Sequence, residues 1–138
     1  PSNWISNSDV IDQLSGIKSK HIMIIADSCF SGSLTRGLEI PDGTDTEKWI
    51  KKIKELKART VLTSGNLEPV SDGGKNNHSI FAYYLLEALK KNERFLTGDG
   101  LYDQIKKPVA INSNQTPQYT NLSKSGSEGG DFIFVRNN

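Results

Sequence analysis

Apolar and polar residues follow one another along this chain in two patterns, one typical of buried strands and the other typical of helices. Residues 21–26 form a continuous apolar run, rich in isoleucine and without alternation. Such a run predicts a strand buried on both faces of a parallel sheet. Further strands are expected over 59–64 and 131–135, and strands that alternate with helical segments predict an α/β fold.

Helical spacing of apolar residues predicts four helices between and around these strands, over 9–15, 45–57, 79–91 and 99–107. Ser8 is expected to cap the first helix, and Pro108 is expected to end the last one, because proline lacks a backbone N–H. Residues 33–43 and 112–130 are mostly polar and are expected to form loops.

The first strand leads directly to the chain's only cysteine, Cys29, on a turn made of Ser and Gly residues. Open α/β sheets bind their ligands at the carboxyl ends of the strands, so Cys29 is a candidate nucleophile. Backbone N–H groups at Cys29 are candidate donors to a substrate oxyanion, because the small residues Ser31 and Gly32 follow closely. The alternative is a structural cysteine that fills the core, which is the common role of an unpaired thiol.

Asp27 lies two residues before the cysteine. In a regular strand, residues i and i+2 point to the same side, so we expect Asp27 and Cys29 to face one cavity if the strand stays regular. A carboxylate at the end of a buried strand is costly without a partner. We therefore expect Asp27 to meet a cationic group.

The segment 24–32, which reads Ile-Ile-Ala-Asp-Ser-Cys-Phe-Ser-Gly, resembles the nucleophile segment of the caspase-like cysteine peptidases (family C14), in particular their metacaspase and bacterial branch. Segments 59–65, 68–70, 78–82, 115–119 and 130–135 resemble the family's later segments in order. The resemblance implies a caspase-like α/β fold, with a mostly parallel central sheet flanked by helices. It also implies a cysteine endopeptidase that works through a Cys-His dyad. Residues 1–138 would then form the C-terminal part of its single peptidase domain.

The histidines depart from the family pattern, in which the catalytic His lies well upstream of the Cys. His21 begins the same strand and is about 26 Å from Cys29 along it, while His78 follows the Cys at an expected helix start, where capping or loop hydrogen bonding explains it better. The chain also begins at Pro1 without an initiator Met. We therefore expect a processed chain or a fragment, whose partner is an N-terminal fragment of the same precursor that carries the first strands and the His.

The resemblance at Asp27 implies which P1 residue of a substrate the peptidase prefers. Caspases, which cut after Asp, have Gln two positions before the nucleophile, whereas metacaspase-like members, which cut after Arg or Lys, have Asp there. A carboxylate attracts a guanidinium or ammonium group and repels a carboxylate, so we expect a basic P1 residue. The alternative is that Asp27 only accepts hydrogen bonds from nearby backbone amides. Further candidates for the same substrate cleft are Ser64, Gly65, Glu68 and Asp72.

The region after Cys29, where caspase relatives are often cut, offers four candidate sites of self-cleavage after a basic residue: Arg36, Lys48, Lys51 and Lys52. No Cys or His cluster with metal-ligand spacing and no EF-hand pattern occurs. We therefore expect catalysis without a cofactor, and the sequence leaves calcium activation open.

Composition narrows the class of protein. The net charge is +1, from 17 basic and 16 acidic residues, which gives no electrostatic reason to expect binding to nucleic acid or to a membrane. One cysteine excludes an internal disulfide and fits a reducing compartment, so we expect a cytoplasmic protein. The resemblance implies a peptide or protein substrate. A catalytically inactive caspase-like module that acts as an interaction or regulatory subunit remains the alternative. A redox-active thiol enzyme is disfavoured, because no second cysteine is present.

Overall fold

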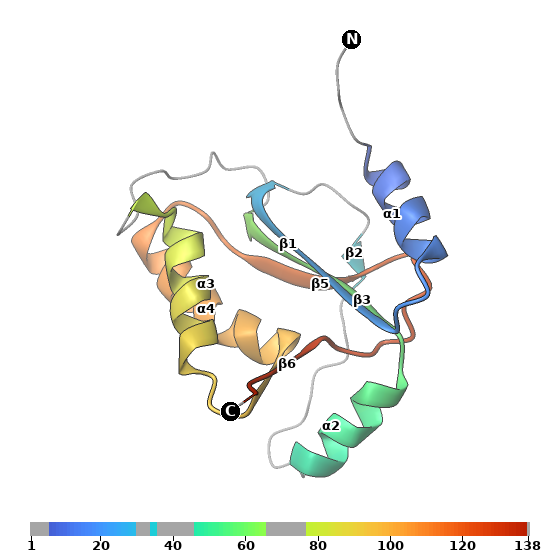
Figure 1. The fold of residues 1–138 in the computed structure, drawn as a ribbon. Helices are drawn as coiled ribbons and strands as arrows, with labels where there is room; N and C mark the ends of the chain where they lie inside the picture. The colour runs from blue at the N-terminus through green and yellow to red at the C-terminus, as the bar shows by residue number, and fades with distance from the viewer. Residues whose placement is uncertain (1–5, 30–33, 36–45, 66–76, 138) are drawn as a thin grey trace.

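The computed structural model describes residues 6–29, 34–35, 46–65 and 77–137 of the 138-residue chain. Helices and strands alternate along it, which confirms the α/β class (Figure 1). In chain order, the elements are α1 (Asn7–Gly16), β1 (His21–Cys29), β2 (Leu34–Thr35), α2 (Thr46–Glu55), β3 (Ala58–Gly65), α3 (Ile80–Lys91), β4 (Phe95–Thr97), α4 (Gly98–Asn112), β5 (Gln118–Leu122) and β6 (Ile133–Val135).

The main sheet has four strands in the order β1-β3-β5-β2. β1 and β3 are parallel, whereas β5 runs antiparallel to both of its neighbours, β3 and β2. Every residue of β3 is buried, but β1 lies at the edge of the described sheet, and its residue Ile25 is 39% exposed. Strands β4 and β6 form a separate antiparallel pair.

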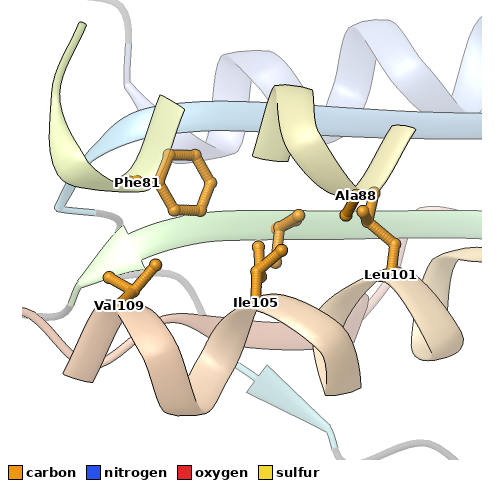
Figure 2. Close-up of a cluster of buried hydrophobic side chains, with 6 residues drawn as sticks. Phe81, Ala88, Leu101, Ile105 and Val109 are labelled. Atoms are coloured by element: carbon orange, nitrogen blue, oxygen red, sulfur yellow. The ribbon is translucent and has the colours of Figure 1, made fainter. Parts of the chain in front are cut away.

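Helices cover the two faces of this sheet, with α3 and α4 on one face and α1 on the other (Figure 1). The larger hydrophobic cluster lies between α3, α4 and the sheet, and Figure 2 shows its helical members facing one another: Phe81, Ala88, Leu101, Ile105 and Val109. Leu62 of β3 joins this cluster, whereas its neighbour Val61 joins the smaller cluster with Leu14 and Leu122. Successive residues of a strand point to opposite faces, so a fully buried β3 serves both clusters.

A buried arginine holds the amino ends of β1 and β3 together. The Arg59 guanidinium donates hydrogen bonds to the backbone carbonyls of Ile17 (3.0 Å), Ser19 (2.7 Å), Lys20 (3.0 Å) and Ala58 (2.9 Å). Four acceptors compensate much of the desolvation of this buried charge. Because the amino ends are fixed and the two strands are parallel, their carboxyl ends emerge together at one edge of the sheet.

Two expectations about helix ends are corrected. The first helix is capped by Ser6, not Ser8, because the Ser6 hydroxyl accepts from the Asp9 N–H (3.1 Å) and the Asp9 carboxylate accepts from the Ser6 N–H (3.3 Å). The last helix continues through Pro108 to Asn112.

The expectation of a loop over 112–130 is also corrected, because β5 lies within it and forms an interior strand of the sheet. Its residues are mostly polar, and it lacks the apolar alternation that marks a strand in a sequence. Backbone pairing with β3, in which Leu62 is opposite Tyr119, and burial of Leu122 account for its place in the sheet.

Candidate active site

Cys29 is the last residue of β1 and lies opposite Gly65, the last residue of β3. Ala26 lies opposite Thr63, so β1 advances three residues while β3 advances two. A register shift of this kind is typical of a β-bulge, which bends a strand and changes the direction of its side chains, often next to active sites. The register of β1 against β3 therefore shifts between Ala26 and Cys29, and the expectation that the Asp27 and Cys29 side chains face one cavity stays a prediction. The Cys29 side chain lies outside the described residues.

Asp27 is exposed and contacts the start of α3. The Ser79 hydroxyl donates a hydrogen bond to Oδ2 of Asp27 and, as the N-cap of α3, accepts one from the Ala82 N–H (2.9 Å). The Asp27 carboxylate thus lies at the N-terminal end of a twelve-residue helix. The positive end of a helix dipole attracts a carboxylate in this position.

Buried hydrogen bonds stabilise the carboxyl end of β3. Ser64 is fully buried, and its hydroxyl accepts a hydrogen bond from Nε2 of Gln115 (3.1 Å), which is itself 1% exposed. The Thr63 hydroxyl donates to the Gly65 carbonyl (3.2 Å). Among the described residues, Oε1 of Gln115 has no hydrogen-bond partner. The structure therefore brings Gly65 to Cys29 through backbone pairing and places the Ser64 side chain beneath the strand end; their contact with substrate stays a prediction.

The remaining candidates lie elsewhere. Glu68, Asp72 and Arg36 are outside the described residues. Lys48, Lys51 and Lys52 lie in α2, so cleavage after any of them requires local unwinding of that helix, because proteases bind their substrates in extended form.

The two histidines differ in their relation to Cys29. His21 begins β1, at the opposite end from Cys29, and its Nε2 lies 3.0 Å from the Leu56 carbonyl oxygen. His78 is exposed and directly precedes Ser79, so it lies near the Asp27 end of β1. His78 forms no hydrogen bond or ion pair with the other described residues.

Two residues at this edge were not identified as site residues from the sequence, Ser79 and Gln115. Ser79 precedes an apolar helical segment, which is a signal for an N-cap, but nothing in the spacing indicates its bond to a residue 52 positions away. Gln115 lies in a polar segment after α4. Its burial depends on the tertiary packing that brings it to Ser64.

Comparison with known protein families gives a match. The family model of peptidase C14, described as the caspase domain, matches residues 1–125. Neither the curated proteins nor the solved structures gave a match. In the described part of the chain, none of the helices is long and apolar enough to cross a membrane. The same residues contain no group of three or more His, Cys, Asp or Glu side chains that could hold a metal ion.

Proposed function

This chain belongs to the caspase domain family of peptidases, and from that premise we propose that it supplies the nucleophile of a cysteine endopeptidase that cleaves after Arg or Lys. Cys29 is the nucleophile. The general base is a His on an N-terminal segment of the same precursor, outside this sequence. The position of His21 supports this assignment, since the length of β1 separates it from Cys29.

The observation that carries the specificity proposal is the environment of Asp27. Its carboxylate is exposed at the carboxyl end of β1, and within the described ranges it accepts a hydrogen bond from the neutral Ser79 hydroxyl alone. No Lys or Arg among the described residues forms an ion pair with it. A carboxylate that is held in place and forms no ion pair with the described Lys and Arg residues is suited to bind a guanidinium or ammonium group of a substrate.

The proposed chemistry is acyl transfer through the thiol. The His takes the proton of Cys29, and the thiolate attacks the carbonyl carbon of the scissile bond. Backbone N–H groups at Cys29 stabilise the oxyanion of the tetrahedral intermediate. The His then gives its proton to the leaving amine, and water hydrolyses the thioester to free the thiol. No metal ion takes part in these steps.

The edge of β1 supports the partner proposal. β1 pairs with β3 on one side, and among the described residues no strand pairs with its other side. It carries four consecutive large apolar residues, from Ile22 to Ile25, and a long apolar edge strand invites further pairing. We infer that a strand of the N-terminal segment covers this edge, which would bring the His toward the carboxyl end of the sheet.

The test is labelling of the native full-length protein with two peptidyl chloromethylketones that differ only at P1, with Arg in one and Asp in the other. We expect the Arg reagent to add one inhibitor mass to the chain that contains Cys29, because the thiolate displaces chloride and Asp27 binds the guanidinium. Intact-mass spectrometry measures the addition, and peptide mapping locates it. Parallel samples with calcium and with a chelator test activation by the ion.

Matched variants separate the parts of this proposal. Cys29→Ala abolishes labelling, Asp27→Asn removes the preference for the Arg reagent, and His21→Ala and His78→Ala retain labelling because the base lies elsewhere. Labelling by the Asp reagent alone would leave a peptidase but contradict basic specificity. Labelling by neither reagent, with the His-bearing segment present, would favour the inactive interaction module.

A further inference from the structure

The Ser79 hydroxyl joins two features of the site that are far apart in the sequence. It lies at the start of α3 and donates to the Asp27 carboxylate at the end of β1, 52 residues earlier. It also accepts a hydrogen bond from the Ala82 N–H at 2.9 Å. A serine hydroxyl has one proton to donate, and here that proton is directed to Asp27.

This link orients the carboxylate. Oδ2 of Asp27 is occupied by Ser79, and Oδ1 has no recorded hydrogen bond among the described residues. Ser79 is half-buried and fixed by its capping bond to a helix that packs on the core through Phe81 and Ala88. A rigid donor of this kind restricts the rotamer of an otherwise exposed side chain, which lowers the entropy lost when a ligand binds to it.

We propose that Ser79 is a positioning residue for specificity, which holds Asp27 in the orientation that receives a basic P1 side chain. The inference rests on the proposed function, in which Asp27 binds the P1 residue. Ser79 acts through Asp27 and makes no contact with the scissile bond. Replacement of Ser79 should therefore weaken recognition of the positive charge at P1, and only in a protein that retains the Asp27 carboxylate.

The experiment uses the full-length protein and two peptide substrates that differ only at P1, Arg in one and its neutral isostere citrulline in the other. The readout is the ratio of their kcat/KM values, which isolates recognition of the charge from general effects on activity. Because hydrogen bonds to charged groups are the stronger ones, we expect Ser79→Ala to lower the Arg/citrulline ratio about tenfold. Ser79→Thr keeps a hydroxyl and a cap, and it should keep most of the ratio.

Capping gives a way to separate positioning from stability. At an N-cap, Gly retains most of the stability that Ala loses, yet neither residue has a hydroxyl. Positioning predicts that Ser79→Gly and Ser79→Ala lower the ratio equally, although Ser79→Ala has the lower Tm. A purely structural role predicts that the ratio follows the Tm. Ser6→Ala removes the cap of α1 and is the matched control, with a lowered Tm and an unchanged ratio.

A double-mutant cycle completes the test, because neighbouring groups that act through each other are not additive. In an Asp27→Asn background, Ser79→Gly should leave the ratio unchanged. An unchanged ratio in Ser79→Gly, in a protein whose preference for Arg depends on Asp27, would overturn the role of Ser79 and leave the proposed function intact. No preference for Arg in the wild-type protein would overturn both.

Discussion

The Asp131 carboxyl is a partly buried acid that joins the C-terminal strand to α4. It accepts hydrogen bonds from the Tyr119 hydroxyl and from the backbone N–H groups of Asp99 (3.0 Å) and Phe132 (2.7 Å). Burial nevertheless raises the pKa of Asp131, and burial together with the nearby Asp131 raises the pKa of Tyr119. Tyr119 is thus held as a protonated donor, and the charge of Asp131 is disfavoured by folding.

A pH dependence of stability follows from Asp131. Because its pKa in the folded state lies above the usual 3.8, the folded protein holds this proton more tightly than the unfolded chain. The stabilising contribution of Asp131 is therefore complete at a pH below the usual pKa, and it is lost as the pH rises through the raised pKa of the folded state. We expect Asp131→Asn to reduce this fall in the free energy of unfolding, measured by urea denaturation from about pH 4 to about pH 8.

The matched control for this prediction is Asp12→Asn on the exposed surface of α1, which removes the same formal charge. It should leave the pH dependence of the wild-type protein in place. If the free energy of unfolding changed equally with pH in Asp131→Asn and in the wild-type protein, Asp131 would contribute nothing to the pH dependence.

At the site, sequence reasoning placed Cys29 and Asp27 at a strand end because a polar, small-residue turn follows an apolar run. It did not place Ser79 beside Asp27. Hydrogen bonds between residues distant in the sequence leave no periodic signal, and the register shift before Cys29 depends on its pairing with Gly65 in the neighbouring strand.

Among the elements, α4 shows how packing overrides a local preference. Proline within a helix removes a backbone hydrogen bond and crowds the carbonyl four residues earlier, yet α4 continues for four residues beyond Pro108. Val109 is fully buried in the cluster between α3 and α4, and burying such a side chain contributes about 1.5–3 kcal/mol. This gain is comparable to the penalty of the proline, so the helix does not end there.

Replacement of Pro108 should therefore stabilise the protein. Pro108→Ala restores the N–H donor toward the Gln104 carbonyl, and we expect the free energy of unfolding to rise by about 1–3 kcal/mol. Chemical denaturation measures the change, with Lys107→Ala, an exposed neighbour in the same helix, as the control, expected to stay within about 0.5 kcal/mol. A loss of stability in Pro108→Ala would mean that the proline stabilises the native protein, for instance by restricting the unfolded chain.

Across the whole molecule, the two sides of β1 differ. One side pairs with β3 over most of its length, whereas among the described residues the other side pairs with nothing. That edge carries both backbone polar groups and apolar side chains. The proposed N-terminal strand would form hydrogen bonds with the backbone groups and bury the apolar side chains.

Hydrogen exchange on the full-length protein tests this arrangement. We expect the outward-facing amides of β1 to be protected as strongly as those of β3, because a covering strand makes them exchange through global opening. Mass spectrometry of peptides that span 21–29 and 58–65 provides the comparison within one sample. Fast exchange of alternate β1 amides would contradict the proposed pairing.

The sequence by itself determined the class of the fold, the strand that leads to Cys29, and the family, because apolar runs, helix caps and a contiguous motif are local properties. Only the tertiary structure decided which strand became the fully buried one, that polar β5 lies inside the sheet, and that Asp27 meets Ser79. The physical reason is that pairing, burial and long-range hydrogen bonds depend on partners that the chain brings together only when it folds.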